Sequence, residues 1–195
     1  MIDPSRIKKI AISTSGGDAP GLNAVIRAAT LSALRLGWEV WGIRYGYRGL
    51  FDGCQDSDLV LLQREMIRGI THRGGSILGT VNKGNPFEFP VKQPDGTTIT
   101  VDRSDEVMRN FRRHKFDAHI CVGGYGSLRI AHQFIKKGMP VIGVPKTIDN
   151  DLSGTVTTFG FDTAVTTATD ALDKLHTTAE SHERVMVVEM MGRYA

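Results

Sequence analysis

Short apolar runs alternate along the chain with longer segments in which apolar residues recur at helical spacing. Runs of four to eight β-branched and apolar residues are typical of buried strands, whereas a period of about 3.6 residues is typical of helices. The pattern predicts strands at 8–14, 39–45, 117–122, 140–144 and 184–191. It predicts helices at 22–36, 104–114, 127–137 and 162–179, and a hairpin over 87–102 that turns at 94–96.

This alternation determines the expected fold class. Parallel strands joined by helices bury both faces of their sheet, so the pattern favours an open, doubly wound α/β fold with a mostly parallel sheet. Neither an internal repeat nor a low-complexity linker interrupts it. In such folds, ligands bind beyond the carboxyl ends of the strands, where loops lead into helix N-termini. The loops that follow the predicted strands are therefore the expected place for function.

Composition and charge narrow the classes of protein that fit. The 195 residues are 41% hydrophobic, and the formal net charge of +3 is too small to indicate a nucleic-acid partner. No apolar run reaches the roughly 20 residues of a membrane span, and the first residues lack the apolar stretch of a signal peptide. Cys54 and Cys121 lack CxxC spacing, which indicates neither a disulfide framework nor a zinc site. A cytoplasmic protein with reduced cysteines is expected, with Cys121 buried in a strand.

The first predicted strand is followed by the glycine-rich stretch SGGDAPG, residues 15–21. Paired glycines leave backbone N–H groups accessible, and the N-terminus of the following helix attracts anions. The same pattern also serves tight strand-to-helix packing, so phosphate binding is one of two interpretations. The spacing matches neither G-x-G-x-x-G nor G-x-x-x-x-G-K-[ST], which argues against a dinucleotide fold and a P-loop.

A second glycine-rich loop, GGYGS at 123–127, follows another predicted strand. Its three glycines let the backbone approach a phosphate, and Ser127 is expected to cap the next helix. Tyr125 is the one bulky side chain among them. The loop is therefore interpreted as a phosphate cradle, the alternative being a plain turn that carries a surface tyrosine.

The most informative loop is PKTIDND, residues 145–151, at the end of a predicted strand. Lys146 supplies a cation and Thr147 a hydroxyl group, while Asp149 and Asp151 supply carboxylates. Transfer of a phosphoryl group to an alcohol needs a carboxylate to accept the hydroxyl proton, and cations or amides to neutralise the phosphate. The loop therefore predicts a phosphotransferase site, the alternative being a solvated acidic turn.

Four segments, in order along the chain, resemble motifs of the phosphofructokinase family: TSGGDAPGLNAVIR, PKTIDND, GFDTA and VMVVEMMGR. The resemblance spans essentially the whole chain. A glycine-rich loop alone would also suit NAD kinases or lipid kinases, but the PKTIDND and MGR segments distinguish the chain from those. The resemblance implies the same fold class and a glycolytic kinase that transfers the γ-phosphoryl group of ATP to the 1-hydroxyl group of fructose 6-phosphate.

The resemblance also implies roles on the acceptor side of the reaction. Asp149 is implied as the general base, with Thr147 beside it binding substrate and Asp151 supporting the arrangement of charges. The other implied sugar-phosphate contacts are Ile148, Arg184, Met191, Gly192 and Arg193, of which Arg193 also contacts the transition state. Arg184 would reach the sugar phosphate of a neighbouring subunit, which implies a homo-oligomer, expected to be a tetramer, with shared sites.

On the donor side, the resemblance implies contacts from the glycine loops and from cationic residues. The implied donor contacts are Gly17, Asn82, Lys83, Gly124, Tyr125, Gly126, Ser127 and Lys146. Gly126 resembles the ATP-using members, because a side chain there would obstruct the nucleotide. Lys146 resembles the members that use pyrophosphate, so ATP is the expected donor and pyrophosphate the alternative. Lys83 would replace an arginine of the family as a point charge.

Two further positions depart from the family pattern. Tyr125 replaces an aspartate that helps to hold the Mg²⁺ of the donor, and a neutral phenol is a poor ligand for this hard cation. A non-catalytic paralogue, which binds sugar phosphate or pairs with an active subunit, is therefore the alternative to an active kinase. Thr30 stands where an effector-site arginine is expected beside Arg27, so the family's control by ADP and phosphoenolpyruvate is expected to be absent.

The resemblance divides the chain into two parts. Residues 1–158 correspond to the domain that binds ATP and Mg²⁺, and residues 159–195 to the beginning of the sugar-phosphate domain. Because family members continue well beyond this point, the chain is expected to be a truncated form or a fragment. Its last predicted strand would then have exposed edges, which favour association.

Overall fold

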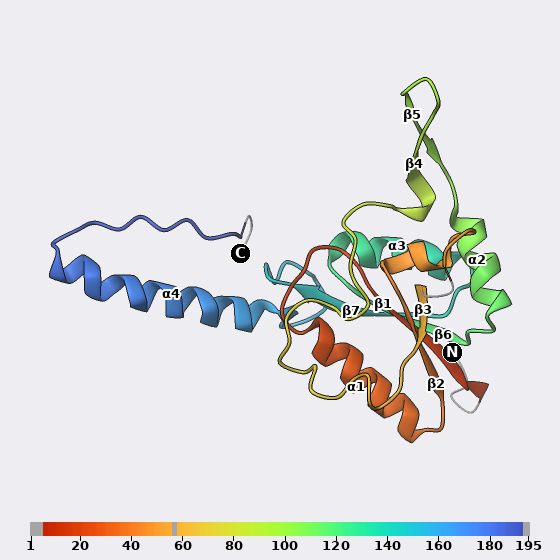
Figure 1. The fold of residues 1–195 in the computed structure, drawn as a ribbon, viewed down its shortest axis with the longest axis horizontal. Helices are drawn as coiled ribbons and strands as arrows, with labels where there is room; N and C mark the ends of the chain where they lie inside the picture. The colour runs from red at the N-terminus through yellow and green to blue at the C-terminus, as the bar shows by residue number, and fades with distance from the viewer. Residues whose placement is uncertain (1–5, 56–57, 193–195) are drawn as a thin grey trace.

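A six-stranded sheet forms the centre of the protein, whose computed structural model describes residues 6–55 and 58–192. Its strands are β1 (Lys9–Thr14), β2 (Glu39–Ile43), β3 (Leu59–Leu61), β6 (Ala118–Gly123), β7 (Val141–Thr147) and β8 (Phe159–Gly160). They lie in the order β3-β2-β1-β6-β7-β8, and all neighbours are parallel except β2 and β3. The predicted, mostly parallel sheet is confirmed (Figure 1).

Helices cover both faces of this sheet (Figure 1). They are α1 (Leu22–Arg35), α2 (Ser104–Arg113), α3 (Tyr125–Lys136) and α4 (Phe161–Ser181), with the 3-10 turns η2 (Gly46–Leu50) and η4 (Pro86–Glu88). Ile10 and Ile12 of β1 pack with α1 into one buried cluster, whereas Ala11 packs with α2 and α3 into another. Because successive side chains of a strand point to opposite faces, β1 lies between two cores. The doubly wound fold is therefore confirmed.

A two-stranded hairpin projects from this body (Figure 1). β4 (Phe89–Lys92) and β5 (Thr98–Val101) pair antiparallel. In the turn between them, the Asp95 carboxylate accepts a hydrogen bond from the Thr97 N–H at 2.9 Å. The predicted hairpin and its turn at 94–96 are confirmed.

Helix α3 begins two residues earlier than the sequence predicted. Its N-cap residue is Gly124, so no side chain caps the helix. Ser127 instead lies inside the first turn with its side chain buried against Gly123, where an added Cβ would come within 2.4 Å of Ser127 Cβ. The predicted serine cap is therefore wrong, because the extended backbone of Gly124 starts the helix before Ser127 is reached.

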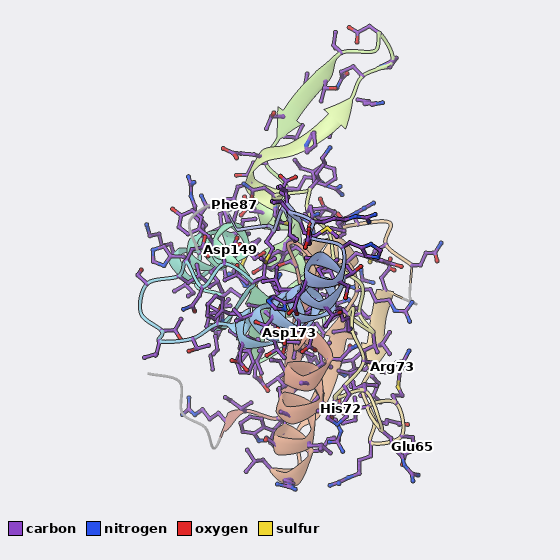
Figure 2. The ribbon with its side chains drawn as sticks, turned by 90° about the vertical axis from the view of Figure 1, so that its left-hand side faces the viewer. Glu65, His72, Arg73, Phe87, Asp149 and Asp173 are labelled. Atoms are coloured by element: carbon purple, nitrogen blue, oxygen red, sulfur yellow. The ribbon has the colours of Figure 1, made fainter. Side chains whose placement is uncertain are left out.

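The last described helix, α4, carries no buried residue, and the chain after it runs back past the helix (Figure 1). Figure 2 looks along α4, with Asp173 among its exposed side chains. The strand predicted at 184–191 is wrong, since these residues pair with no strand of the described chain. A strand needs a hydrogen-bonded neighbour, and without one this apolar segment is extended and exposed. None of the helices in residues 6–55 and 58–192 is long and apolar enough to cross a bilayer.

Candidate active site

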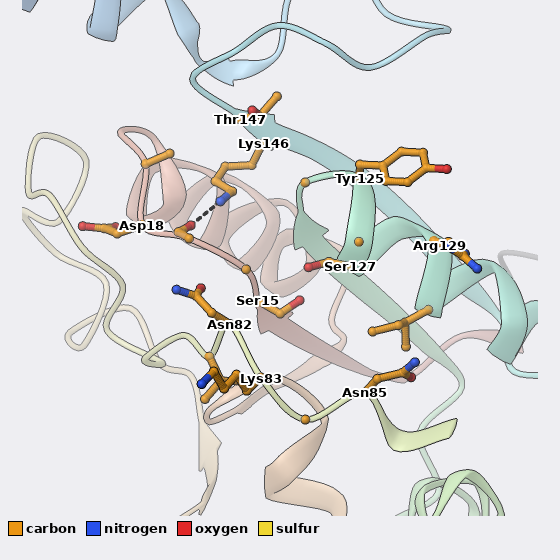
Figure 3. A pocket seen from close by; sticks show the side chains of 18 of the residues that line it. Ser15, Asp18, Asn82, Lys83, Asn85, Tyr125, Ser127, Arg129, Lys146 and Thr147 are labelled. Carbon is orange, nitrogen blue, oxygen red and sulfur yellow. Dashed lines mark hydrogen bonds between the residues drawn. The ribbon is translucent and has the colours of Figure 1, made fainter. Parts of the chain in front are cut away.

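A cavity of about 540 Å³, the central pocket, opens at the carboxyl end of the sheet (Figure 3). Its lining comes largely from the loops after β1, β6 and β7 and from the segment 81–88. The three loops singled out in the sequence thus meet in one place, because parallel strands end at the same edge of a sheet. The lining includes these predicted site residues: Gly17, Asn82, Lys83, Gly124, Tyr125, Gly126, Ser127, Lys146, Thr147, Ile148, Asp149 and Met191.

The loop after β1 is joined to the segment that carries Asn82 and Lys83. The Gly16 N–H donates to the Val81 carbonyl at 3.0 Å, and the Thr80 hydroxyl donates to the Gly16 carbonyl. Gly16 has a φ of 84°, a left-handed conformation that glycine adopts at little cost. These hydrogen bonds hold the two walls together, so that Asn82 and Lys83 line the same pocket as the glycine loop (Figure 3).

The N-terminus of α3 opens into the central pocket without a capping side chain. The N-cap residue is Gly124, which has no side chain to accept a hydrogen bond from the first N–H groups of the helix. The first turn also contains no acidic residue. Free N–H groups and the positive end of the helix dipole make this position attractive to an anion. A Cβ added at Gly126 would meet no atom within 4 Å, so this glycine leaves open space in the pocket.

Lys146, near the end of β7, is only 4% exposed. Its ammonium group donates a hydrogen bond to the Gly17 carbonyl, which links the third loop to the first (Figure 3). Burial lowers the pKa of Lys146 below its usual 10.5, and the charge of the Asp18 carboxylate opposes this shift. The Lys146 ammonium group thus lies against the glycine loop after β1, where it can attract a phosphate.

Asp149 and Asp151, which we expected to act together, lie in different hollows. Asp149 lines the central pocket, and its N–H donates to the Thr147 hydroxyl at 3.1 Å. Asp151 is exposed and lines a neighbouring hollow together with Tyr125. Between them, Asn150 turns the chain with a φ of 51°. Asp149 is therefore the carboxylate of this loop that can reach a ligand in the central pocket.

The acceptor-side residues near the C-terminal end are only partly brought to the pocket. Met191 lines it, whereas Arg184 and Gly192 do not. Arg184 is exposed just beyond α4. Arg193 lies outside the described residues.

Tyr47, which the sequence analysis missed, also lines the central pocket. Its side chain is 5% exposed, with ring centroids 5.3 Å from His119 and 4.6 Å from Phe134. Its hydroxyl meets no group at regular hydrogen-bond geometry in the described chain, and burial, followed by the interaction with the Cys121 thiol, raises the pKa of Tyr47 well above its usual value. No pattern in the sequence indicates this role, because the residues of η2, GYRGL, have the composition of a glycine-rich bend.

Arg129 and Gln133 of α3 also line the central pocket, and the sequence analysis did not single them out. Their four-residue spacing could have placed them on one face of the helix.

His119, whose ring contacts that of Tyr47, makes the free energy of unfolding depend on pH. It is fully buried in β6, with Nε2 hydrogen-bonded to Ser13 Oγ at 2.8 Å, and burial lowers its pKa from 6.5 to about 3. The unfolded chain takes up a proton near pH 6.5, but the folded chain does so only near pH 3. The free energy of unfolding should therefore fall between these values as pH is lowered, by up to about 1.4 kcal/mol per pH unit.

Urea unfolding at several pH values measures this effect. His119→Gln keeps a hydrogen-bonding group but does not titrate, so its stability should decline less steeply between pH 6.5 and 3. Equal slopes for both proteins would contradict the assignment to His119.

The central pocket offers few ligands for a magnesium ion of its own. No group of three or more His, Cys, Asp or Glu side chains within the described ranges could hold a metal ion. A Mg²⁺ ion that arrives with phosphates needs only one or two carboxylates, and Asp18 and Asp149 line the pocket. Tyr125 is 67% exposed, and its ring points away from Asp18 and Lys146 (Figure 3). The residues therefore fit Mg²⁺ as part of a metal–phosphate complex rather than as a resident ion.

Fold and pocket together define an α/β protein with a pocket at the carboxyl end of its sheet whose lining suits an anion such as phosphate. The family model described as phosphofructokinase matches residues 9–195. The chain belongs to the phosphofructokinase family, as the sequence motifs predicted.

Individual relatives agree with this membership. ATP-dependent 6-phosphofructokinase 2 of Clostridium perfringens is 53% identical, covering 100% of this chain and 52% of that protein. ATP-dependent 6-phosphofructokinase of Chloroflexus aggregans is 50% identical, covering 97% of this chain and 51% of that protein. The solved phosphofructokinase from Saccharomyces cerevisiae has a TM-score of 0.78 and 31% identity, covering 95% of this chain and 26% of that one. The chain thus spans about half the length of the curated relatives it matches.

Proposed function

We propose that this chain carries the donor site of an ATP-dependent 6-phosphofructokinase. The whole protein would transfer the γ-phosphoryl group of ATP to the 1-hydroxyl group of fructose 6-phosphate. The observation that carries the proposal is that Asp149, Lys146 and the uncapped N-terminus of α3 share one pocket. The names of the two bacterial relatives, both ATP-dependent, support ATP as the donor.

In the proposed reaction, Asp149 accepts the proton of the attacking hydroxyl group. The oxygen of this hydroxyl group forms a bond to the γ-phosphorus of ATP. The bond from the γ-phosphorus to the β–γ bridging oxygen breaks, and ADP leaves with that oxygen. Lys146, Lys83 and the free N–H groups of α3 would stabilise the charge of the transferred group. Asp18 would help to hold the Mg²⁺ that neutralises the phosphates of ATP.

We further propose that residues 1–158 form the donor domain and that 159–195 begin the domain that binds fructose 6-phosphate. The lack of buried residues in α4 supports this division, because the two cores are formed before it. The proposed sugar-phosphate contacts are Thr147, Ile148, Met191, Gly192 and Arg193. Arg184 is exposed beyond the projecting α4, which supports a role in the sugar-phosphate site of a neighbouring subunit of a homo-oligomer.

A coupled assay tests the reaction and the donor together. Fructose 6-phosphate would be supplied with ATP or with pyrophosphate, both to this chain and to a chimera that continues into the C-terminal half of the Clostridium perfringens relative. Formation of fructose 1,6-bisphosphate with ATP supports the proposal. Activity with pyrophosphate alone would assign the alternative donor, which the buried Lys146 motivates. Absence of activity with both donors would contradict the proposed reaction.

Tyr125 favours a second candidate function, a non-catalytic member that binds sugar phosphate or pairs with an active subunit. If the phenol impairs metal binding, Tyr125→Asp in the chimera should raise kcat/KM at limiting Mg²⁺ by about tenfold, because a carboxylate is a far better ligand for Mg²⁺. Titration of free Mg²⁺ measures this change, with Tyr125→Phe as the uncharged control. High and equal activity of the unsubstituted and Asp forms at all Mg²⁺ concentrations would exclude this second candidate.

A further inference from the structure

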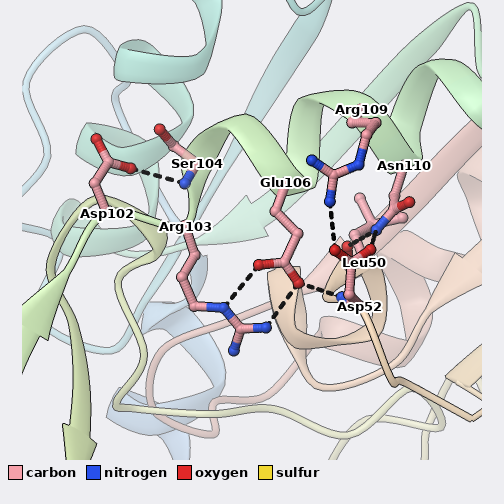
Figure 4. A network of polar contacts seen from close by, with 8 residues as sticks. All are labelled: Leu50, Asp52, Asp102, Arg103, Ser104, Glu106, Arg109 and Asn110. Atoms are coloured by element: carbon pink, nitrogen blue, oxygen red, sulfur yellow. Dashed lines mark hydrogen bonds and ion pairs between the residues drawn. The ribbon is translucent and has the colours of Figure 1, made fainter.

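A network of polar contacts joins α2 to the chain directly after η2, outside the central pocket (Figure 4). Asn110 of α2 is 6% exposed, and its side-chain amide donates to the Leu50 carbonyl and to the Asp52 carboxylate, both at 2.9 Å. Glu106, one turn earlier in α2, accepts a hydrogen bond from the Asp52 N–H. Two side chains of one helix therefore hold the end of η2.

Arg103 supports this network from the base of the hairpin. Its guanidinium group donates two hydrogen bonds to Glu106, at 2.8 and 2.7 Å. The same group lies 3.9 Å from the ring centroid of Phe51 and 5.0 Å from that of Phe89. A bidentate ion pair that also stacks on aromatic rings has a restricted geometry. The Glu106 carboxylate is therefore fixed at its place beside η2.

The turn that this network holds also forms part of the central pocket. η2 spans five residues, and Tyr47 lies three residues before Leu50 within it. A single 3-10 turn has poor internal hydrogen-bond geometry, and here it follows Tyr45, which has a left-handed φ of 56°. The turn therefore depends on outside contacts for its position, and the side chains of α2 supply those at its C-terminal end, beside the packing of Tyr47 on His119 and Phe134.

We propose that Asn110 is a positioning residue for the central pocket. By holding Leu50 and Asp52 it fixes η2, and so sets the place of the Tyr47 side chain in the pocket wall. Without the amide, the Leu50 carbonyl loses its side-chain donor, and an unpaired buried acceptor favours local rearrangement. This inference rests on the proposed function, because ATP is the ligand whose binding reports the position of Tyr47.

Asn110→Asp tests the inference, because it replaces the amide donor by a carboxylate that would repel Asp52, while nearly preserving the shape of the side chain. Titration calorimetry of this chain with Mg²⁺ and ATP should show about tenfold weaker binding than for the unsubstituted chain. Tyr47→Ala should also weaken binding. If Asn110 acts through Tyr47, adding Asn110→Asp to the Tyr47→Ala variant should cause no further loss. Lys137→Ala is the matched control: it breaks a 2.7 Å ion pair to Asp105 of α2, and binding should be unchanged.

A second variant keeps the test informative should the buried substitution unfold the chain. The Asp52 side chain is 57% exposed, and Asp52→Ala removes one of the two acceptors of Asn110 together with an exposed ion pair to Arg109, so about threefold weaker binding is expected. Unchanged binding in both Asn110→Asp and Asp52→Ala, or additive losses in the double variant, would overturn the inference and leave the proposed function intact. If the unsubstituted chain binds neither ATP nor pyrophosphate, both proposals fail.

Discussion

Asp149→Asn is expected to lower kcat of the chimera by about 10²–10⁴-fold, with little change in the KM for ATP. Asparagine fills the same space, but its amide cannot accept the proton of the attacking hydroxyl group, and general-base catalysis contributes rate enhancements of this size. The backbone should be unaffected, because the hydrogen bond that positions Asp149 runs from its own N–H to Thr147. Steady-state kinetics with ATP varied at saturating fructose 6-phosphate measure both constants.

Two further carboxylates of the chain serve as controls for this substitution. Asp151→Asn should cost much less than Asp149→Asn, since Asp151 is exposed and lies in a neighbouring hollow. Asp173→Asn, on the exposed α4, should change nothing (Figure 2). Equal losses for Asp149→Asn and Asp151→Asn would remove the distinction that the structure makes between them.

Gly126→Asp is expected to weaken ATP binding by about 100-fold or more, while pyrophosphate binding is lost to a much smaller extent. The Cβ of the new side chain would lie in open space, with no protein atom within 4 Å, and the side chain would occupy the space of a nucleotide. The larger donor should suffer more, because it needs more of the open space.

Gly126→Asp should leave the fold intact, so a loss of ATP affinity would not be caused by a loss of stability. An aspartate in the first turn of α3 interacts favourably with the helix dipole, so the melting temperature should not fall. Gly126→Ala is the control for bulk without charge, and competition binding with each donor gives the two affinities. Retention of full ATP affinity by Gly126→Asp would place the nucleotide elsewhere.

Much of the fold could be predicted because it follows from local pattern. Successive side chains of β1 point to opposite faces of the sheet and enter the two cores. The glycine and charge patterns of the loops after the strands indicated ligand-binding loops, and these loops line one pocket. Parallel topology brought those loops together, so the residues of each loop could be placed without any tertiary information.

The remaining features depend on contacts that no local pattern reveals. Tyr47 enters the pocket because η2 is held by α2, about 60 residues later in the chain. The segment 184–191 has the composition of a strand, yet strand formation requires a neighbour, and composition does not supply one. Ser127 was misplaced because Gly124, rather than a polar side chain, begins α3.

The junction between the glycine loop after β1 and the segment at Thr80 and Val81 has a consequence for folding. The walls of the pocket are distant in sequence, and β1 pairs with β6 more than 100 residues later. Contacts of such separation form slowly, because long loops must close first. A partly folded chain therefore has no complete pocket, and a donor that binds only the finished one stabilises the native state alone. At a free concentration of 100 times its Kd, this ligand would add about 2.7 kcal/mol to the free energy of unfolding. The donor would then protect the chain from unfolding and from proteolysis of its unfolded form.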